Sequence, residues 1–216
     1  MKKIYLNTFA SLVGIKKEGS LIKAMIRMVE SSDVPFRYSR IRPSVRSFFI
    51  EGCDSSVLSD KLAELETVVV SSDFKKNDLA KSKLALKMIL ETSFRSLEGK
   101  KMCRPEIKSY TFYGIQMAVN PDAIIKWKGE DGKVHVGAIK TKLKKSSFRK
   151  DEAVMIACIL KHYLYTLYPD CVVEESCCFC FDAFRRRMYS PENYLQNIVR
   201  AAGIARKISL MDREVA

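Results

Sequence analysis

Residues 120–142, NPDAIIKWKGEDGKVHVGAIKTK, contain two short apolar runs on either side of a turn with two glycines. This pattern predicts a β-hairpin. Asp122 stands at the start of the first strand, and Lys140 stands at the end of the second. Two interpretations are open: a metal-binding hairpin of an enzyme, or an ordinary hairpin with charged ends. For Asp122 the ordinary role is a turn aspartate after proline.

Helical and extended patterns alternate on both sides of this hairpin. From residue 77 the order is helix, three strands, helix, one or two strands, helix, which predicts an α/β layered domain. The helices are expected at 77–99, at 151–169 and from Ser190 onward, and the last strand pattern covers 171–184. Gly99 is expected to end the first helix, and Pro191 to open the last. The middle helix is apolar nearly all round, so burial on more than one side is expected.

The first seventy residues predict a helical or mixed extension. Residues 20–30 and 55–70 have helical patterns. Residues 34–52 contain two prolines, which favour an extended arm or an edge strand. We therefore expect an N-terminal extension over 1–70 and an α/β domain over 71–216.

Composition limits which membrane partners and which cellular compartment are expected. No run approaches the roughly 20 consecutive apolar residues of a membrane span, so no membrane partner is expected. The seven cysteines are odd in number and lack a framework spacing. Reduced thiols in the cytoplasm are the simpler account.

The net charge of +13 is concentrated in two segments. Residues 1–50 carry ten Lys/Arg against three acids, and residues 101–150 carry twelve against four. Such a surplus indicates a surface that faces a polyanion, DNA above all. A solvated basic face is the alternative. The candidate DNA-binding residues are Lys142, Lys144, Lys145, Arg149, Lys150, Arg37, Arg40 and Arg42. The arginines of the 37–46 segment, Arg46 included, have a second reading, in which they pair with the acidic 51–66 stretch.

A metal-dependent phosphodiesterase needs carboxylates that hold a divalent cation, and a cation that stabilises the charge on the reacting group. With a long helix before it and another after it, YGIQMAVNPDAIIKW…GKVHVGAIKTK resembles the PD-(D/E)XK nuclease superfamily, in its RecB/Cas4-like branch. The resemblance covers roughly residues 77–185. It implies a restriction-endonuclease-like mixed β-sheet flanked by helices, and Mg²⁺ or Mn²⁺ as the cofactor.

By this resemblance Asp122 is a metal ligand and Lys140 the catalytic lysine. Glu91, on the preceding helix, is an additional catalytic acid and metal ligand. The carboxylate position two residues before Lys140 is Ala138, a departure from the family pattern. Either Glu91 or an acid of the next helix, Asp151 or Glu152, replaces it, or the fold is kept for binding.

Three functions therefore stay open. The first is a metal-dependent DNA nuclease, and the second is an inactive nuclease-fold protein that binds DNA or a DNA-associated protein. The third is an interaction protein unrelated to nucleic acid. No iron–sulfur cluster is expected, because Cys177, Cys178 and Cys180 stand in a strand pattern that puts the first on one face and the other two on the opposite face.

Overall fold

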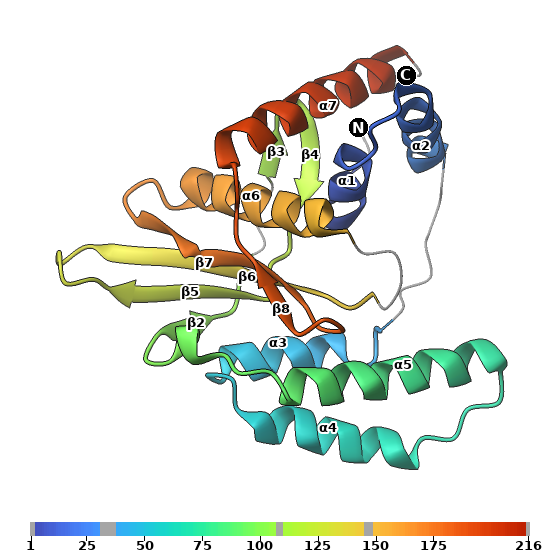
Figure 1. The fold of residues 1–216 in the computed structure, drawn as a ribbon, viewed down its shortest axis with the longest axis vertical. Helices are drawn as coiled ribbons and strands as arrows, with labels where there is room; N and C mark the ends of the chain where they lie inside the picture. The colour runs from blue at the N-terminus through green and yellow to red at the C-terminus, as the bar shows by residue number, and fades with distance from the viewer. Residues whose placement is uncertain (1–2, 31–37, 107–109, 145–148, 215–216) are drawn as a thin grey trace.

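A five-stranded mixed sheet forms the middle layer of the molecule, with helices on both faces (Figure 1). The computed structural model describes residues 3–30, 38–106, 110–144 and 149–214. In sheet order the strands are β2 (Lys101–Cys103), β5 (Ala123–Lys128), β6 (Val134–Lys142), β7 (Val172–Asp182) and β8 (Arg187–Tyr189). Only the β6–β7 pair among these neighbours is parallel. The α/β class predicted from the sequence is confirmed.

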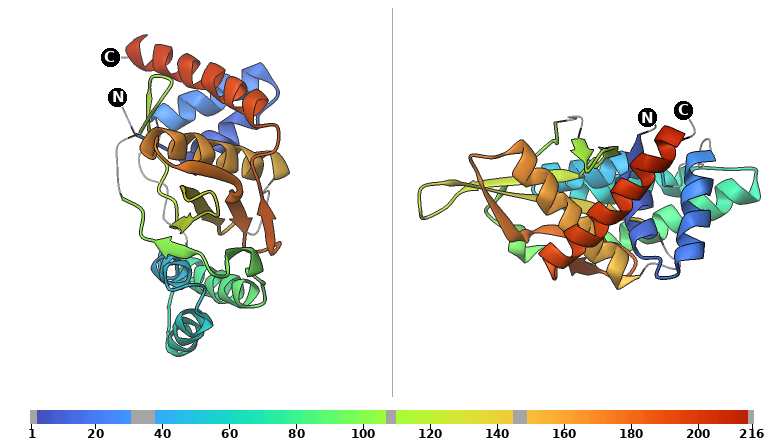
Figure 2. Two further views of the ribbon diagram at one scale, coloured as in Figure 1. Left: turned by 90° about the vertical axis from the view of Figure 1, so that its left-hand side faces the viewer. Right: turned by 90° about the horizontal axis from the view of Figure 1, so that it is seen from above.

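The parallel pair β6–β7 is joined by helix α6 (Lys150–Leu167), because parallel neighbours need a crossover connection. This helix lies on the sheet and is covered from above by α1 (Leu6–Val13) and α7 (Tyr194–Glu214), as Figure 2 shows. Twelve of its residues, including Ile156 and Leu160, are buried. The prediction of a helix buried on more than one side is therefore confirmed.

A second, three-stranded sheet lies above α6. Its order is β1 (Ile4–Tyr5), β4 (Ile115–Ala118) and β3 (Tyr110–Phe112). The first strand of the chain runs parallel to β4, with Tyr5 in register with Ala118. Helix α2 (Glu18–Glu30) completes this upper layer (Figure 1).

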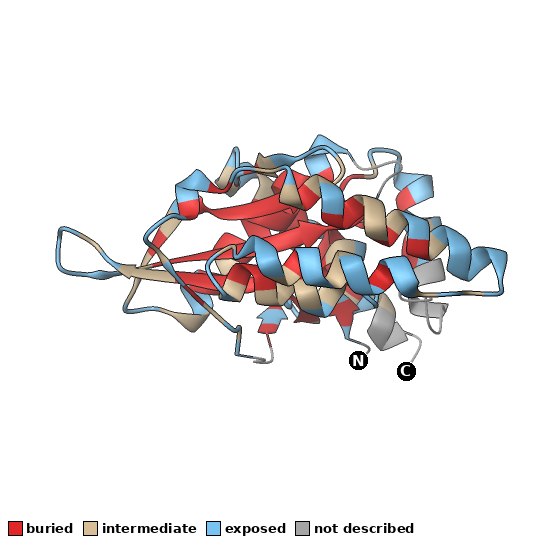
Figure 3. Cartoon of the chain, turned by 90° about the horizontal axis from the view of Figure 1, so that it is seen from below, coloured by how far each residue is buried: buried red, intermediate tan, exposed pale blue. Residues whose placement is uncertain are grey.

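The lower face of the five-stranded sheet is covered by α3 (Arg42–Ile50) and α5 (Asp73–Leu90), with α4 (Ser55–Thr67) outside them. A short 3₁₀ turn, η1 (Arg95–Leu97), leads into β2. Two hydrophobic cores result, one above the sheet and one below it. Figure 3 shows that the central strands are largely buried, whereas the outer helices carry many exposed residues. The first seventy residues contribute to both cores, through Phe9 above and Phe49 below.

Strand β6 supplies both cores because successive side chains of a strand point to opposite faces. Val136 and Ala138 belong to the upper core, and Ile139 belongs to the lower one. The same alternation in β7 separates its thiols as predicted. Cys177 joins the lower core, and Cys178 and Cys180 join the upper one. All seven cysteines are free thiols.

Three predicted helix boundaries are wrong. Helix α5 begins at Asp73, after a Ser72 side-chain cap, rather than at Asn77. Helix α5 ends at Leu90 rather than near Gly99, since the chain turns at Thr92 and carries Phe94 into an aromatic cluster. Helix α7 begins at Tyr194 rather than at Pro191. The left-handed backbone at Asn193, with φ of 49°, places the preceding residues in a turn.

The extended arm expected around residues 34–52 is also wrong for its described part. Residues 42–50 form α3, with Pro43 in the first turn. Proline fits there because the first N–H groups of a helix have no partner within the helix. The segment before Tyr38 lies outside the described residues.

No helix in the described ranges is long and apolar enough to cross a membrane.

A candidate nucleic-acid interface at the end of the central hairpin

Asp122 and Lys140 lie together at the end of the β5–β6 hairpin. The register pairs Ala123 with Ile139, so the residues on either side of this pair are neighbours. Lys140 Nζ is 3.9 Å from Asp122 Oδ1. Both side chains are almost completely buried, with 6% of the lysine and 1% of the aspartate exposed. The structure thus brings together two of the three residues that the resemblance assigns to the reaction.

The Asp122 carboxylate already has further partners. The backbone N–H of Thr141 donates to Oδ2 over 2.5 Å, and Arg46 Nε lies 3.4 Å from Oδ1. The Asp122 backbone N–H donates to the Ile139 carbonyl at 2.7 Å, which fixes the residue against β6. This carboxylate therefore serves as the counter-ion of a buried lysine and a half-buried arginine.

Burial lowers the pKa of Lys140 below the ordinary lysine value. The negative charge of Asp122 opposes this shift, while the positive charges of Arg42 and Arg46 reinforce it. The ammonium group also donates to the backbone carbonyl of Asn120. Because Arg42 and Arg46 both act on Lys140, these two arginines, one turn apart on helix α3, face the end of β6.

Lys142 is the next residue on the same face of β6. Burial lowers its pKa, and the nearby Glu152 carboxylate counteracts the shift. Glu152, in the first turn of α6, also lies 3.8 Å from Arg149 Nε. Its Oε2 is buried and has no hydrogen-bond partner in the part of the chain that the structure describes.

Arg149 connects this group to the upper layer. Its guanidinium lies against Gly14 at the end of α1, where an added Cβ would come within 2.0 Å of the Arg149 side chain. A side chain at residue 14 would therefore make the Arg149 guanidinium move.

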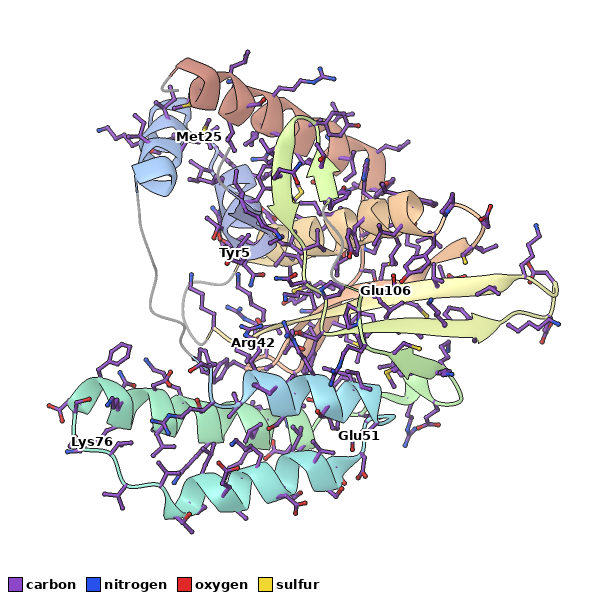
Figure 4. The ribbon with its side chains drawn as sticks, turned by 180° about the vertical axis from the view of Figure 1, so that it is seen from behind. Tyr5, Met25, Arg42, Glu51, Lys76 and Glu106 are labelled. Atoms are coloured by element: carbon purple, nitrogen blue, oxygen red, sulfur yellow. The ribbon has the colours of Figure 1, made fainter. Side chains whose placement is uncertain are left out.

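We call these six cationic side chains the basic cluster: Arg42, Arg46, Lys140, Lys142, Lys144 and Arg149. They come from α3, from the end of β6 and from the approach to α6. Figure 4 places Arg42 on the helical layer at this end of the molecule. The neighbouring carboxylates are Asp122, Glu152 and Asp182, the last of which stands opposite Lys142 in the β6–β7 register. The six cations of the cluster outnumber these three carboxylates. Lys144 is exposed, and Arg46 and Arg149 have 42% and 47% of their side chains exposed.

The other predicted metal ligands do not join Asp122 in a metal site. Glu91 directly follows the last residue of α5. Its side chain is half-exposed and forms an ion pair with Arg186 at 2.9 Å. Ala138 is completely buried against the upper core, and Asp151 points to solvent. No three histidine, cysteine or acidic side chains among the described residues gather as metal ligands. With Asp122 bound to Thr141, Arg46 and Lys140, these residues do not fit a Mg²⁺ or Mn²⁺ site.

The remaining predicted DNA-binding residues have separate positions. Lys150 forms an ion pair with Glu192 at 2.7 Å, so its charge is compensated, and Arg40 is exposed on the turn before α3. Arg37 and Lys145 lie outside the described residues. The suggestion that the 37–46 arginines pair with the 51–66 acids is wrong for Arg46, because its carboxylate partner is Asp122. No local sequence pattern predicts the pair of Arg46 and Asp122, which are far apart in the chain.

Comparison with protein-family models, with curated proteins and with solved structures finds no match to this chain.

Proposed function

We propose that the chain is a nucleic-acid-binding protein that contacts phosphate groups through the basic cluster. The observation that carries this proposal is the convergence of six cations from three segments on one end of the sheet. Lysine and arginine side chains that neutralise phosphates give affinity that depends on salt and not on sequence. Arg42, Arg46, Lys144 and Arg149 provide the accessible contacts, and Lys140 and Lys142 add positive potential beneath them.

We further propose that the five-stranded sheet is of restriction-endonuclease-like type. The order of elements supports this: helix α5, the antiparallel strands β2, β5 and β6, helix α6, then β7 parallel to β6. Asp122 and Lys140 occupy the hairpin end where the resemblance expects them. In this proposal the fold serves binding, because the carboxylate missing at Ala138 has no replacement among the described residues beside Asp122.

Removing two cluster charges should weaken binding strongly. We expect Arg42→Gln combined with Lys144→Gln to lower the affinity for DNA by tenfold or more at low salt. The slope of log affinity against log salt should fall by about one for each lost phosphate contact. The measurement is fluorescence anisotropy of a labelled oligonucleotide over a salt series.

The matched control is Lys128→Gln with Lys133→Gln. Both lysines are exposed at the opposite end of the same hairpin, so the variant has the same net charge. The control should bind within about twofold of wild type. Equal losses in the two double variants would contradict a localised site and leave only the overall charge as the cause.

Phosphodiester cleavage is the second candidate function, and the observation that favours it is the contact between Asp122 and Lys140. The proposed binding role predicts that labelled single- and double-stranded DNA stays intact with Mg²⁺ or Mn²⁺. Gel analysis of end-labelled strands measures this. Cleavage that disappears in both Asp122→Asn and Lys140→Ala would instead establish the nuclease function.

A further inference from the structure

Tyr5 is an exposed aromatic residue next to the basic cluster. It is the last residue of β1. The preceding residue, Ile4, is buried in the upper core, whereas 52% of Tyr5 is exposed. The core therefore does not account for an aromatic side chain at this position. Figure 4 shows Tyr5 in the upper layer and Arg42 in the helical layer below it.

The strand pairing ties Tyr5 to the cluster. Its register partner Ala118 is the last residue of β4, and two residues later the Asn120 carbonyl accepts the hydrogen bond from Lys140. One strand pairing and two residues of chain therefore connect Tyr5 with the carbonyl that binds Lys140. Backbone pairing thus ties the position of the phenol ring to this end of the central hairpin.

An exposed ring beside phosphate-binding cations distinguishes between kinds of nucleic acid. In a duplex the faces of the bases are stacked on one another, whereas a single strand offers them to an aromatic side chain. Stacking of one base on such a ring contributes about 1–3 kcal/mol and tolerates any sequence. The cations then hold the phosphates on either side of the stacked base.

We propose that the site binds single-stranded nucleic acid, with a base stacked on Tyr5 and the neighbouring phosphates on Arg42, Arg46 and Lys144. This inference rests on the proposed function and specifies its ligand. The arginines of α3 belong to the lower layer and β1 belongs to the upper one, so the bound strand contacts both layers.

The test compares the full-length wild type with Tyr5→Leu, Tyr5→Phe and Tyr165→Leu. Tyr165 is a matched control because it is 48% exposed on α6, about 22 Å along the helix from Lys150. The probes are labelled oligothymidine, oligouridine and a DNA duplex of equal length. A 2-aminopurine base in the single strand reports stacking through quenching of its fluorescence.

We expect wild type to bind the single strands more tightly than the duplex. Tyr5→Leu should lower single-strand affinity by five- to a hundredfold, the equivalent of one stacked base. It should abolish the quenching and leave duplex affinity and the salt slope unchanged. Tyr5→Phe and Tyr165→Leu should bind as wild type does. Tighter binding of oligothymidine or of oligouridine assigns the ligand to DNA or to RNA.

The outcomes separate the two proposals. If no probe binds at low salt, the proposed function itself fails. A cooperative thermal unfolding transition shows whether the Tyr5→Leu protein is folded. If the folded Tyr5→Leu protein changes neither affinity nor quenching, while Arg42→Gln with Lys144→Gln weakens binding, only the single-strand inference is overturned. Duplex binding as tight as single-strand binding would overturn it too.

Discussion

Replacing Asp122 by alanine is expected to lower the free energy of unfolding by about 3–5 kcal/mol, the cost of breaking a buried ion pair from one side. The substitution leaves the Lys140 ammonium group buried at the sheet end with a single carbonyl acceptor, and leaves the Thr141 N–H without its carboxylate oxygen. Urea unfolding followed by circular dichroism measures the effect.

Two further variants identify the cause. Asp122→Ala combined with Lys140→Met should recover part of the loss, because removal of both partners leaves no uncompensated charge. Asp54→Ala removes a control carboxylate that is exposed and caps α4, so a much smaller loss of unfolding free energy than for Asp122→Ala is expected. A single Asp122→Ala variant within 1 kcal/mol of wild type would show that Asp122 is not the counter-ion of the cluster.

Gly137→Ala should also destabilise the protein, by about 2–3 kcal/mol. The strand register shifts here, where β6 advances from Val136 to Ala138 while its β7 partners advance from Val173 to Cys178. A Cβ on Gly137 would lie 2.4 Å from the Cys177 carbonyl oxygen and 2.5 Å from its Cβ. Backbone of β7 must move to accept the methyl group, so the loss arises inside the sheet.

The matched control for this variant is Gly203→Ala. Gly203 lies in helix α7 with open space around the added Cβ. Alanine favours helix over glycine by about 1 kcal/mol, so this variant should be more stable than wild type. Thermal and urea unfolding of both variants measure the contrast. A Gly137→Ala protein as stable as Gly203→Ala would contradict the close β6–β7 approach.

The parts of the fold that follow from local patterns could be predicted. The hairpin between β5 and β6 follows from two apolar runs around a glycine-containing turn, and α6 from a continuous apolar helix pattern. Helix α3 departs from the prediction because prolines favour extended structure within a segment, yet proline is favoured in the first turn of a helix. The C-terminal end of α5 departs from it because the aromatic cluster around Phe94 competes with continued helix.

The candidate site depends on contacts that no local pattern contains. Asp122 and Lys140 could be paired from the hairpin alone, since antiparallel strands bring such ends together. Their third partner, Arg46, comes from a segment expected to be extended. The position of Tyr5, the residue proposed to stack on a base, depends on pairing of β1 with β4. Long-range pairing of this kind is set by tertiary packing rather than by sequence period.

The pairing of β1 with β4 also affects how the chain matures. Strand β1 finds its partner only when residues 115–118 have been made, and pairing over such sequence separations is slow. A fragment that stops before β4 is expected to leave Ile4 and Phe9 of the upper core exposed to water. Such a ribosome-bound fragment should therefore need chaperone protection of β1 and α1, whereas synthesis through α7 should remove that need.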